Sequence, residues 1–141
     1  MRLILGFMLF GVCLPVLGEE YVCNARNKFS DDSSISYSVE RDGEDFLLTR
    51  AMFLDETYTE EPGLNTTKRR FKKPSNMLKM SAENPYTAYF VENEFYLSLN
   101  ILNVLGLHTV LIDKKDMSFE SSELYGKDLE SVTEHGFCFL K

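Results

Sequence analysis

Residues 34–44 read SISYSVERDGE, and this stretch decides the fold class. The apolar residues at positions 35, 37 and 39 alternate with serines and a glutamate, so an extended strand here has one apolar face and one polar face. The dipeptide Asp42-Gly43 follows, and such a pair between two apolar runs is a strong hairpin signal because the turn requires a positive φ. The stretch therefore predicts two antiparallel strands joined by a tight turn.

Similar alternation recurs in the second half of the chain. In residues 94–102, Leu97, Leu99 and Ile101 share one face with Phe95. Residues 86–91 are apolar on both faces, which predicts a central strand or a strand covered on both sides. Turn residues separate these runs, and we expect about seven or eight short strands in all. The strands expected in this half lie at residues 86–91, 94–102, 108–112, 117–120 and 136–140.

Three other stretches are less regular. Residues 46–54 fit a strand but also carry a helical stripe, and we interpret them as a strand. Residues 55–84 contain several turn signals and are interpreted as a long loop or a protruding hairpin. Residues 121–133 are interpreted as an irregular connection with at most one helical turn. The patterns together predict an all-β fold, a single antiparallel meander that forms an open or closed barrel or a sandwich, with room for one short helix.

The N-terminal residues predict a secretory signal peptide. Arg2 is followed by an apolar run, and small or permissive residues precede Glu19. We therefore expect residues 1–18 to be removed and residues 19–141 to form a single antiparallel β domain. Cys13 lacks the small preceding side chain that is expected before a lipidated cysteine, so we interpret it as part of the hydrophobic region.

Bulk composition narrows the classes of function. Removal of 18 of the 141 residues leaves 123, which is enough for one core. Loss of Arg2 changes the formal net charge from −7 to −8, and a chain this acidic repels phosphate backbones, so we expect no nucleic-acid partner. The apolar run of the signal peptide is shorter than the roughly 20 residues of a spanning helix, and we expect no transmembrane segment.

Two cysteines remain after removal of the signal peptide. Cys23 lies in the first predicted strand and Cys138 in the last. Export into an oxidising compartment allows a disulfide between them, which would tie the two ends of the fold together. The chain has no CxxC spacing and no suitably grouped histidines, so we expect neither a redox-active nor a zinc-binding site.

Candidate catalytic groups are few. Histidine-dependent chemistry must use His108 or His135, and both occupy ordinary structural places. Two methionines, at positions 77 and 80, are too few for a thioether copper site, and no glycine-rich phosphate loop is present. We therefore expect no enzyme activity, no metal and no cofactor. Two carboxylate pairs lie at predicted turns, where acidic residues are usually solvated: Glu92 with Glu94, and Asp113 with Asp116.

One short segment is strongly basic and is a candidate anion-binding site. On an acidic protein it would attract an anionic envelope component or an acidic protein. The alternative is a solvated loop whose charges only discourage aggregation. Asn65 begins a glycosylation sequon beside it, which matters only in a eukaryotic source. The basic residues are Lys68, Arg69, Arg70, Lys72 and Lys73.

Four features together resemble a loose class of small periplasmic proteins of unknown function from Gram-negative bacteria: the signal peptide, Cys23, the segment at 112–115 and the closing Gly136-Phe137-Cys138. The resemblance implies an antiparallel meander closed by a cysteine near each end, and it brings no active site. It favours the periplasm over the extracellular space. We expect a non-enzymatic binding or envelope-associated protein. The alternatives are an exported hydrolase with an unrecognised site and a carrier of a small apolar ligand.

Overall fold

The computed structural model describes residues 18–26, 34–54, 63–74, 80, 82, 85–126 and 130–141. These residues form nine β-strands and no α-helix, which confirms the predicted all-β class. The strands are β1 Glu20–Arg26, β2 Ser34–Asp42, β3 Asp45–Leu54, β4 Gly63–Phe71, β5 Tyr86–Glu92, β6 Tyr96–Asn103, β7 Gly106–Asp113, β8 Ser118–Tyr125 and β9 Glu130–Leu140.

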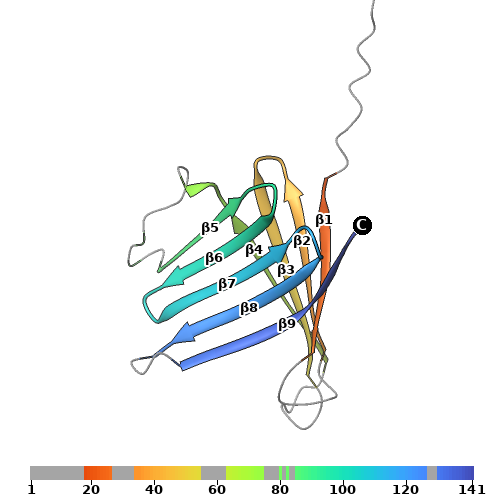
Figure 1. Ribbon diagram of the computed structural model, residues 1–141. Helices are drawn as coiled ribbons and strands as arrows, with labels where there is room; N and C mark the ends of the chain where they lie inside the picture. The colour runs from red at the N-terminus through yellow and green to blue at the C-terminus, as the bar shows by residue number, and fades with distance from the viewer. Residues whose placement is uncertain are drawn as a thin grey trace, which may run out of the picture.

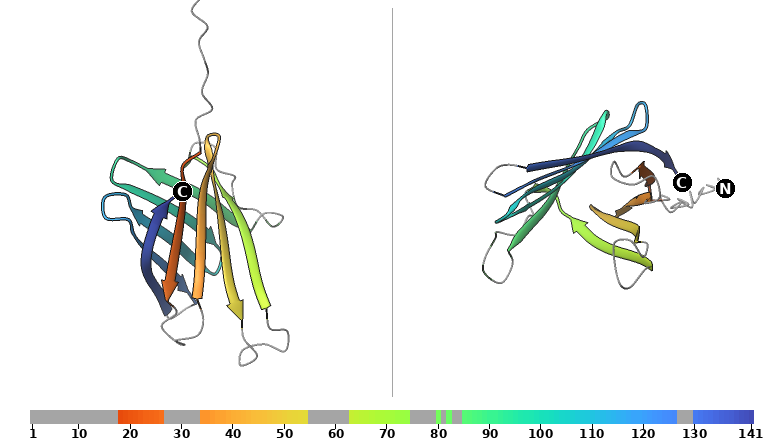
Figure 2. Two further views of the ribbon diagram at one scale, coloured as in Figure 1. Left: turned by 90° about the vertical axis from the view of Figure 1, so that its right-hand side faces the viewer. Right: turned by 90° about the horizontal axis from the view of Figure 1, so that it is seen from below.

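The nine strands belong to one antiparallel sheet with the order β4-β3-β2-β1-β9-β8-β7-β6-β5. Strands that follow one another along the chain pair within two meanders, β1 to β4 and β5 to β9, and the pairing of β1 with β9 joins the meanders. Figure 1 shows β5 to β9 as one slanted array and β1 to β4 as a second, steeper array. Seen from below in Figure 2, the two arrays face each other across a shared interior. The two meanders therefore form one sheet that curves into a nearly closed barrel.

The barrel is closed at only one place between its outer strands, as far as the described residues show. Lys72, just past the end of β4, forms a parallel bridge with Tyr89 of β5. The backbone N–H of Lys72 donates to the carbonyl of Ala88 at 3.3 Å, and the carbonyl of Lys72 accepts from the N–H of Phe90 at 3.0 Å. Along the rest of β4 and β5 the described residues form no ladder. We call this unpaired boundary the seam.

The predicted disulfide is present between Cys23 and Cys138. The two residues lie directly opposite each other in the ladder of β1 with β9, and 115 positions separate them in the sequence. The bond therefore links the first described strand, in one meander, to the last described strand, in the other.

Alternate residues of each strand point inward and form the core. Phe46 of β3 and Phe90 of β5 meet edge to face with ring centroids 4.9 Å apart. Tyr37 of β2 and Phe119 of β8 lie with centroids 5.4 Å apart. Full burial of a large apolar side chain stabilises the fold by about 1.5–3 kcal/mol. The fully buried large side chains are Tyr21, Tyr37, Phe46, Phe71, Ile35, Leu97, Leu99, Ile112, Val39 and Val110, with Cys23 beside them.

The turn signals of the sequence are confirmed. Gly43 has a φ of 64°, in the left-handed region that favours glycine, and β2 pairs with β3 on either side of it. In the turn after β6, the side-chain oxygen of Asn103 accepts from the backbone N–H groups of Leu105 and Gly106 at 2.7 and 2.9 Å. The strand interpretation of residues 46–54 is also confirmed, because they lie within β3.

The structure corrects three expectations. Residues 63–71, expected within a long loop or a protruding hairpin, are strand β4, which pairs with β3 and belongs to the barrel sheet, so both interpretations are wrong there. Residues 121–133 are not an irregular connection, because their described part belongs to β8 and β9 except for the turn residue Gly126. Residues 86–91 are a strand, but β5 ends the sheet order and is not central. The first two errors share a cause: these segments carry polar residues on both faces, which hides the period of two.

Some predictions concern residues outside the described part of the chain. Of the predicted signal peptide, residues 1–18, only Gly18 is described. Met77 also lies outside the described residues. Within the described ranges, no helix is long and apolar enough to cross a membrane.

Candidate ligand-binding site

The interior of the barrel has an apolar end and a polar end. On β3 the inward positions run from Phe46 through Leu48 to Arg50, and on β8 they run from Phe119 through Ser121 to Glu123. The last residues of the two series, Arg50 and Glu123, line the same cavity, whereas the first residues, Phe46 and Phe119, are not part of its wall. Each strand thus changes from large apolar to polar side chains along its length.

The polar end contains a cavity of about 450 Å³. Leu48 and Ile101 are buried and apolar, whereas Leu105, in the turn between β6 and β7, is 75% exposed. The cavity therefore reaches from the apolar core to the surface, and its size is within the usual range of small-molecule pockets. Its walls are built by Leu48, Arg50, Thr67 and Arg69 of β3 and β4, and on the other side by Ile101, Asn103, Leu105, Gly106, Leu107, His108, Glu123, Leu124 and Tyr125.

Arg50 is the most unusual residue of the cavity wall. Its Nε atom is buried and has no hydrogen-bond partner among the described residues. Burial of a polar N–H without an acceptor costs free energy, and the cost is larger on a charged group. A buried unsatisfied donor in a native structure calls for an explanation, and an acceptor supplied by a bound molecule is one.

Arg69 brings a second guanidinium to the cavity. It lies on β4 next to the seam, and its guanidinium carbon is 4.9 Å from the centroid of the Tyr86 ring of β5. This cation–π contact spans the seam at a position where the two backbones are not paired. Arg69 thus belongs to the cavity and connects the two outer strands of the barrel.

The basic segment singled out in the sequence is divided by strand alternation. Of its five basic residues, only Arg69 lines the cavity. Lys68 and Arg70 are its neighbours on β4 and lie on the opposite face, where Arg70 pairs with Asp42 at 2.6 Å and with Asp45 at 3.4 Å. Lys72 lies at the bridge to β5, and Lys73 is 3.8 Å from Glu44. The segment is therefore not one loop with five converging charges.

A chain of polar contacts runs deeper into the barrel from the cavity. The hydroxyl of Tyr37 donates to the Glu134 carboxylate at 2.6 Å and lies 3.3 Å from Oγ of Ser121. Nε2 of His108 lies 2.9 Å from the same Ser121 oxygen. Nδ1 of His108 is 3.7 Å from Oε1 of Glu123. These contacts satisfy polar groups that β2, β7, β8 and β9 bring into the interior.

Burial shifts the titration of two members of this chain of contacts. Burial, helped by the hydrogen bond to Glu134, raises the pKa of Tyr37 to about 12. Burial lowers the pKa of His108 below its ordinary value and outweighs the nearby Glu123 carboxylate, while Arg50 acts in the same direction as burial. His108 is therefore neutral at neutral pH.

Ser121, His108 and Glu123 have the residue types and the order of contacts of a hydrolytic triad. The serine, however, is only 3% exposed and does not line the cavity. The His108 to Glu123 separation is too long for a hydrogen bond, and Ser121 also contacts Tyr37. The arrangement resembles a packed polar network more than an accessible nucleophile.

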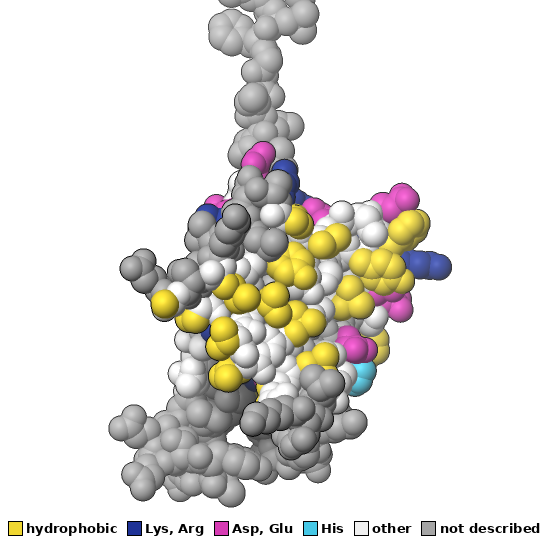
Figure 3. Space-filling view, turned by 90° about the vertical axis from the view of Figure 1, so that its left-hand side faces the viewer, with side chains coloured by type: hydrophobic (Ala, Val, Ile, Leu, Met, Phe, Trp, Pro, Cys, Tyr) yellow, Lys and Arg dark blue, Asp and Glu magenta, His cyan; other side chains and the backbone are white. Residues whose placement is uncertain are grey.

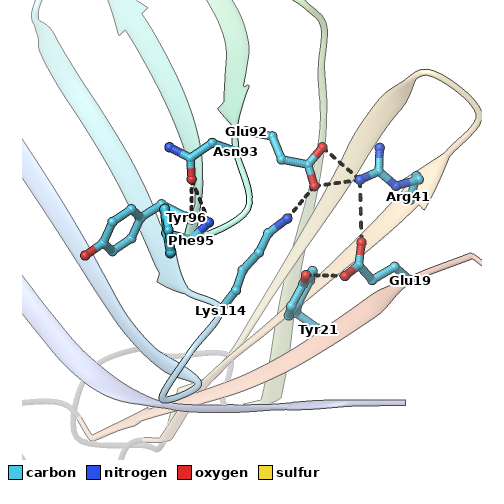
Figure 4. Close-up of polar contacts among 8 residues, drawn as sticks. All are labelled: Glu19, Tyr21, Arg41, Glu92, Asn93, Phe95, Tyr96 and Lys114. Atoms are coloured by element: carbon cyan, nitrogen blue, oxygen red, sulfur yellow. Dashed lines mark hydrogen bonds and ion pairs between the residues drawn. The ribbon is translucent and has the colours of Figure 1, made fainter.

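The apolar end of the barrel is bordered by a network of ion pairs, which we call the end network (Figure 4). Glu92 of β5 accepts hydrogen bonds from Nη2 of Arg41 at 2.6 and 2.8 Å and from Nζ of Lys114 at 2.7 Å. Arg41 also lies 3.5 Å from Glu19 and 4.4 Å from the centroid of the Phe46 ring. Burial would raise the pKa of Glu92, but the bonds from Arg41 and Lys114 outweigh it and hold the pKa below its ordinary value. The end network joins both meanders at the end opposite the cavity.

A second hollow, of about 390 Å³, lies on the outside of β6 to β9. Tyr96, Leu111 and Phe137 line it, and Phe137 is 74% exposed. Glu120 and His135 lie at the same hollow and are 3.6 Å apart. Figure 3 shows hydrophobic side chains spread over this side of the molecule, with acidic side chains near them.

The other candidate residues of the sequence have structural surroundings. Asp113 and Asp116 accept backbone hydrogen bonds within the turn before β8, from Lys115 at 2.8 Å and from Ser118 at 3.0 Å. Glu92 belongs to the end network, and Glu94 is an exposed turn residue. Within the described residues, no group of three or more histidine, cysteine or acidic side chains could hold a metal ion.

Comparison with known proteins gives little further guidance. No family model matches the chain, and no curated protein matches it. Among solved structures, the chain is similar to a crystal structure of a mutant of the fluorescent protein UnaG. The TM-score is 0.44 at 12% sequence identity, and the alignment covers 85% of this chain and 94% of that one. The cavity itself is therefore the best indication of function.

Proposed function

We propose that this protein is a non-enzymatic binding protein that holds a small, partly apolar molecule inside its barrel. The observation that carries the proposal is the cavity of about 450 Å³, which joins a buried apolar wall to polar groups and reaches the surface. Sites of this kind, mostly apolar with a few polar groups that orient the ligand, are typical of small-molecule binding. Of the alternatives considered from the sequence, the carrier is the one that this geometry favours.

The disulfide supports export as the setting of this function. A bond between Cys23 and Cys138 is compatible with an oxidising compartment, and we propose the periplasm, with the extracellular space as the alternative. A binding protein there would meet small molecules outside the cytoplasm. Purification of the mature protein from its native host, followed by N-terminal sequencing, tests this: an N-terminus near Glu19 is expected, and retention of Met1 would contradict export.

A neutral fluorescent probe tests the site directly. Phenylnaphthylamine is apolar and increases its emission on leaving water, so titration should give saturable binding of one molecule per chain. Thr67 and Thr66 are neighbours on β4, both exposed, but only Thr67 lines the cavity. Thr67→Trp should therefore weaken binding by about tenfold or more by filling the cavity, and Thr66→Trp should leave it unchanged. Equal effects of the two tryptophans would show that the probe binds elsewhere.

The hydrolase alternative has its own test. A serine-directed fluorophosphonate should leave the folded protein unlabelled, since Ser121 is buried. Stoichiometric labelling of Ser121 that disappears in His108→Ala would contradict the non-enzymatic proposal.

A further inference from the structure

We infer that the molecule held in the cavity is an amphipathic organic anion, whose anionic group lies between Arg50 and Arg69 on the wall formed by β3 and β4. This inference rests on the proposed function and names the chemical class of its ligand. The class includes carboxylates, sulfonates and phosphates that carry an apolar body.

The first support is the unsatisfied donor of Arg50. Its buried Nε lacks any acceptor in the described part of the chain, although Arg50 lines the cavity. Burial of an unpaired charged donor is unfavourable, and the free energy is recovered when an acceptor of opposite charge arrives. Guanidinium groups pair with the planar or tetrahedral oxygens of organic anions through two parallel N–H donors.

The second support is the position of Arg69. It lines the same cavity from the neighbouring strand, and its guanidinium contacts the uncharged ring of Tyr86, which is 42% exposed. A guanidinium in a cation–π contact has N–H groups that extend beyond the edge of the aromatic ring, and these can still donate to an acceptor. Arg70, by contrast, already pairs with two carboxylates on the outer face.

The charge balance of the cavity wall agrees with an anionic ligand. Of the described side chains that line it, two are guanidinium groups and one, Glu123, is a carboxylate. Glu123 belongs to β8, on the wall opposite Arg50 and Arg69, and lies beside His108. Leu48, Ile101 and Leu107 supply apolar surface for the rest of the ligand.

A matched pair of probes tests the inference. Anilinonaphthalene sulfonate and phenylnaphthylamine share one aromatic body and differ by the sulfonate group. The unaltered protein should bind the sulfonate at least about tenfold more tightly than the neutral probe. Arg50→Gln and Arg69→Gln should each reduce the affinity for the sulfonate by about tenfold or more, and should change the affinity for the neutral probe by less than about twofold. Lys68→Gln is the matched control, because it removes one positive charge from the next position of the same strand but from the outer face.

A second measurement separates ligand recognition from a structural role of Arg50. If the Arg50 Nε–H is paired only when a ligand is bound, Arg50→Gln should leave the thermal midpoint of the free protein unchanged or raise it. Only the unaltered protein should then gain stability from the sulfonate. A lower midpoint for the free Arg50→Gln protein would overturn this assignment. Equal affinities for the two probes, or equal losses in Arg69→Gln and Lys68→Gln, would overturn the anion site while the binding function stands. Absence of saturable binding of both probes would overturn the proposed function itself.

Discussion

Removal of the disulfide should destabilise the fold by an amount that can be worked out from its loop. Replacing Cys23 and Cys138 by alanine frees the unfolded chain from a constraint that closes 115 positions. In the chain-entropy model a loop of this size corresponds to about 4.8 kcal/mol at room temperature, and measured losses for native disulfides are about 2–5 kcal/mol. Both cysteines are almost fully buried, but alanine removes only one sulfur atom from each, so the packing contribution is small beside the loop.

Calorimetry or circular dichroism with and without reductant measures this loss. For a domain of this size we expect the thermal midpoint of the double variant to fall by about 10 °C or more. The variant is also its own control, since reductant should destabilise the unaltered protein and leave the variant unaffected. If the unfolding free energies of the variant and of the oxidised protein differ by less than about 1 kcal/mol, the pairing of β1 with β9 does not depend on the covalent bond. The chain-entropy estimate would then be wrong for this disulfide.

Three further perturbations follow from the same structure. Glu92→Gln should destabilise the protein by about 1–3 kcal/mol at neutral pH because it breaks the end network. The pKa of Glu92 is lower in the folded protein than in the unfolded chain. Its contribution to the unfolding free energy is therefore complete above the unfolded pKa near about 4.3 and is lost as the pH falls through the folded pKa. The unfolding free energies of the two proteins from urea titrations should therefore converge in acid. Ultraviolet titration should show one tyrosine that ionises at about pH 12 if the protein is still folded, and this transition should be absent from Tyr37→Phe. Gly136→Ala should lower the unfolding free energy by about 2–3 kcal/mol, because the new Cβ would collide with the backbone of β1. Gly43→Ala should lower it by only about 1 kcal/mol, because nothing lies within 4 Å of the new Cβ and only the positive φ is strained. Equal losses in the two variants would refute the steric account.

Strands with one apolar and one polar face could be predicted from the sequence. In β2 and β6 the inward residues are apolar throughout their central parts, so the period of two is visible and the turns at Gly43 and Asn103 mark the ends. Strand β4 and the second half of β8 were missed because one of their faces meets the polar cavity and the other meets solvent. No hydrophobic period survives in such a segment, and only the pairing with neighbouring strands identifies it.

The candidate site was missed for a related reason. Arg50, His108 and Glu123 are far apart in the sequence and meet only when both meanders close around the interior. One signal was available: if residues 46–54 form a strand, Arg50 lies on the same face as Phe46 and Leu48, and a charge on a core face points to a buried partner or a ligand. The grouping of Arg69 with its basic neighbours concealed it, because strand alternation sends adjacent charges to opposite faces.

The break between the two ends of the strand sequence and the break in the sheet lie at different places around the barrel. The first and last strands lie side by side in the middle of the sheet, where the backbone N–H of Lys141 donates to the carbonyl of Glu20 at 3.0 Å. The sheet itself is interrupted at the seam, which falls in the middle of the sequence. A chain opened between β4 and β5 and joined from β9 to β1 by a short linker would therefore run β5 to β9 and then β1 to β4, in the same order as the sheet. Every strand in that rearranged chain would pair with its immediate neighbour, and the disulfide would close a short loop instead of one that encloses nearly the whole fold.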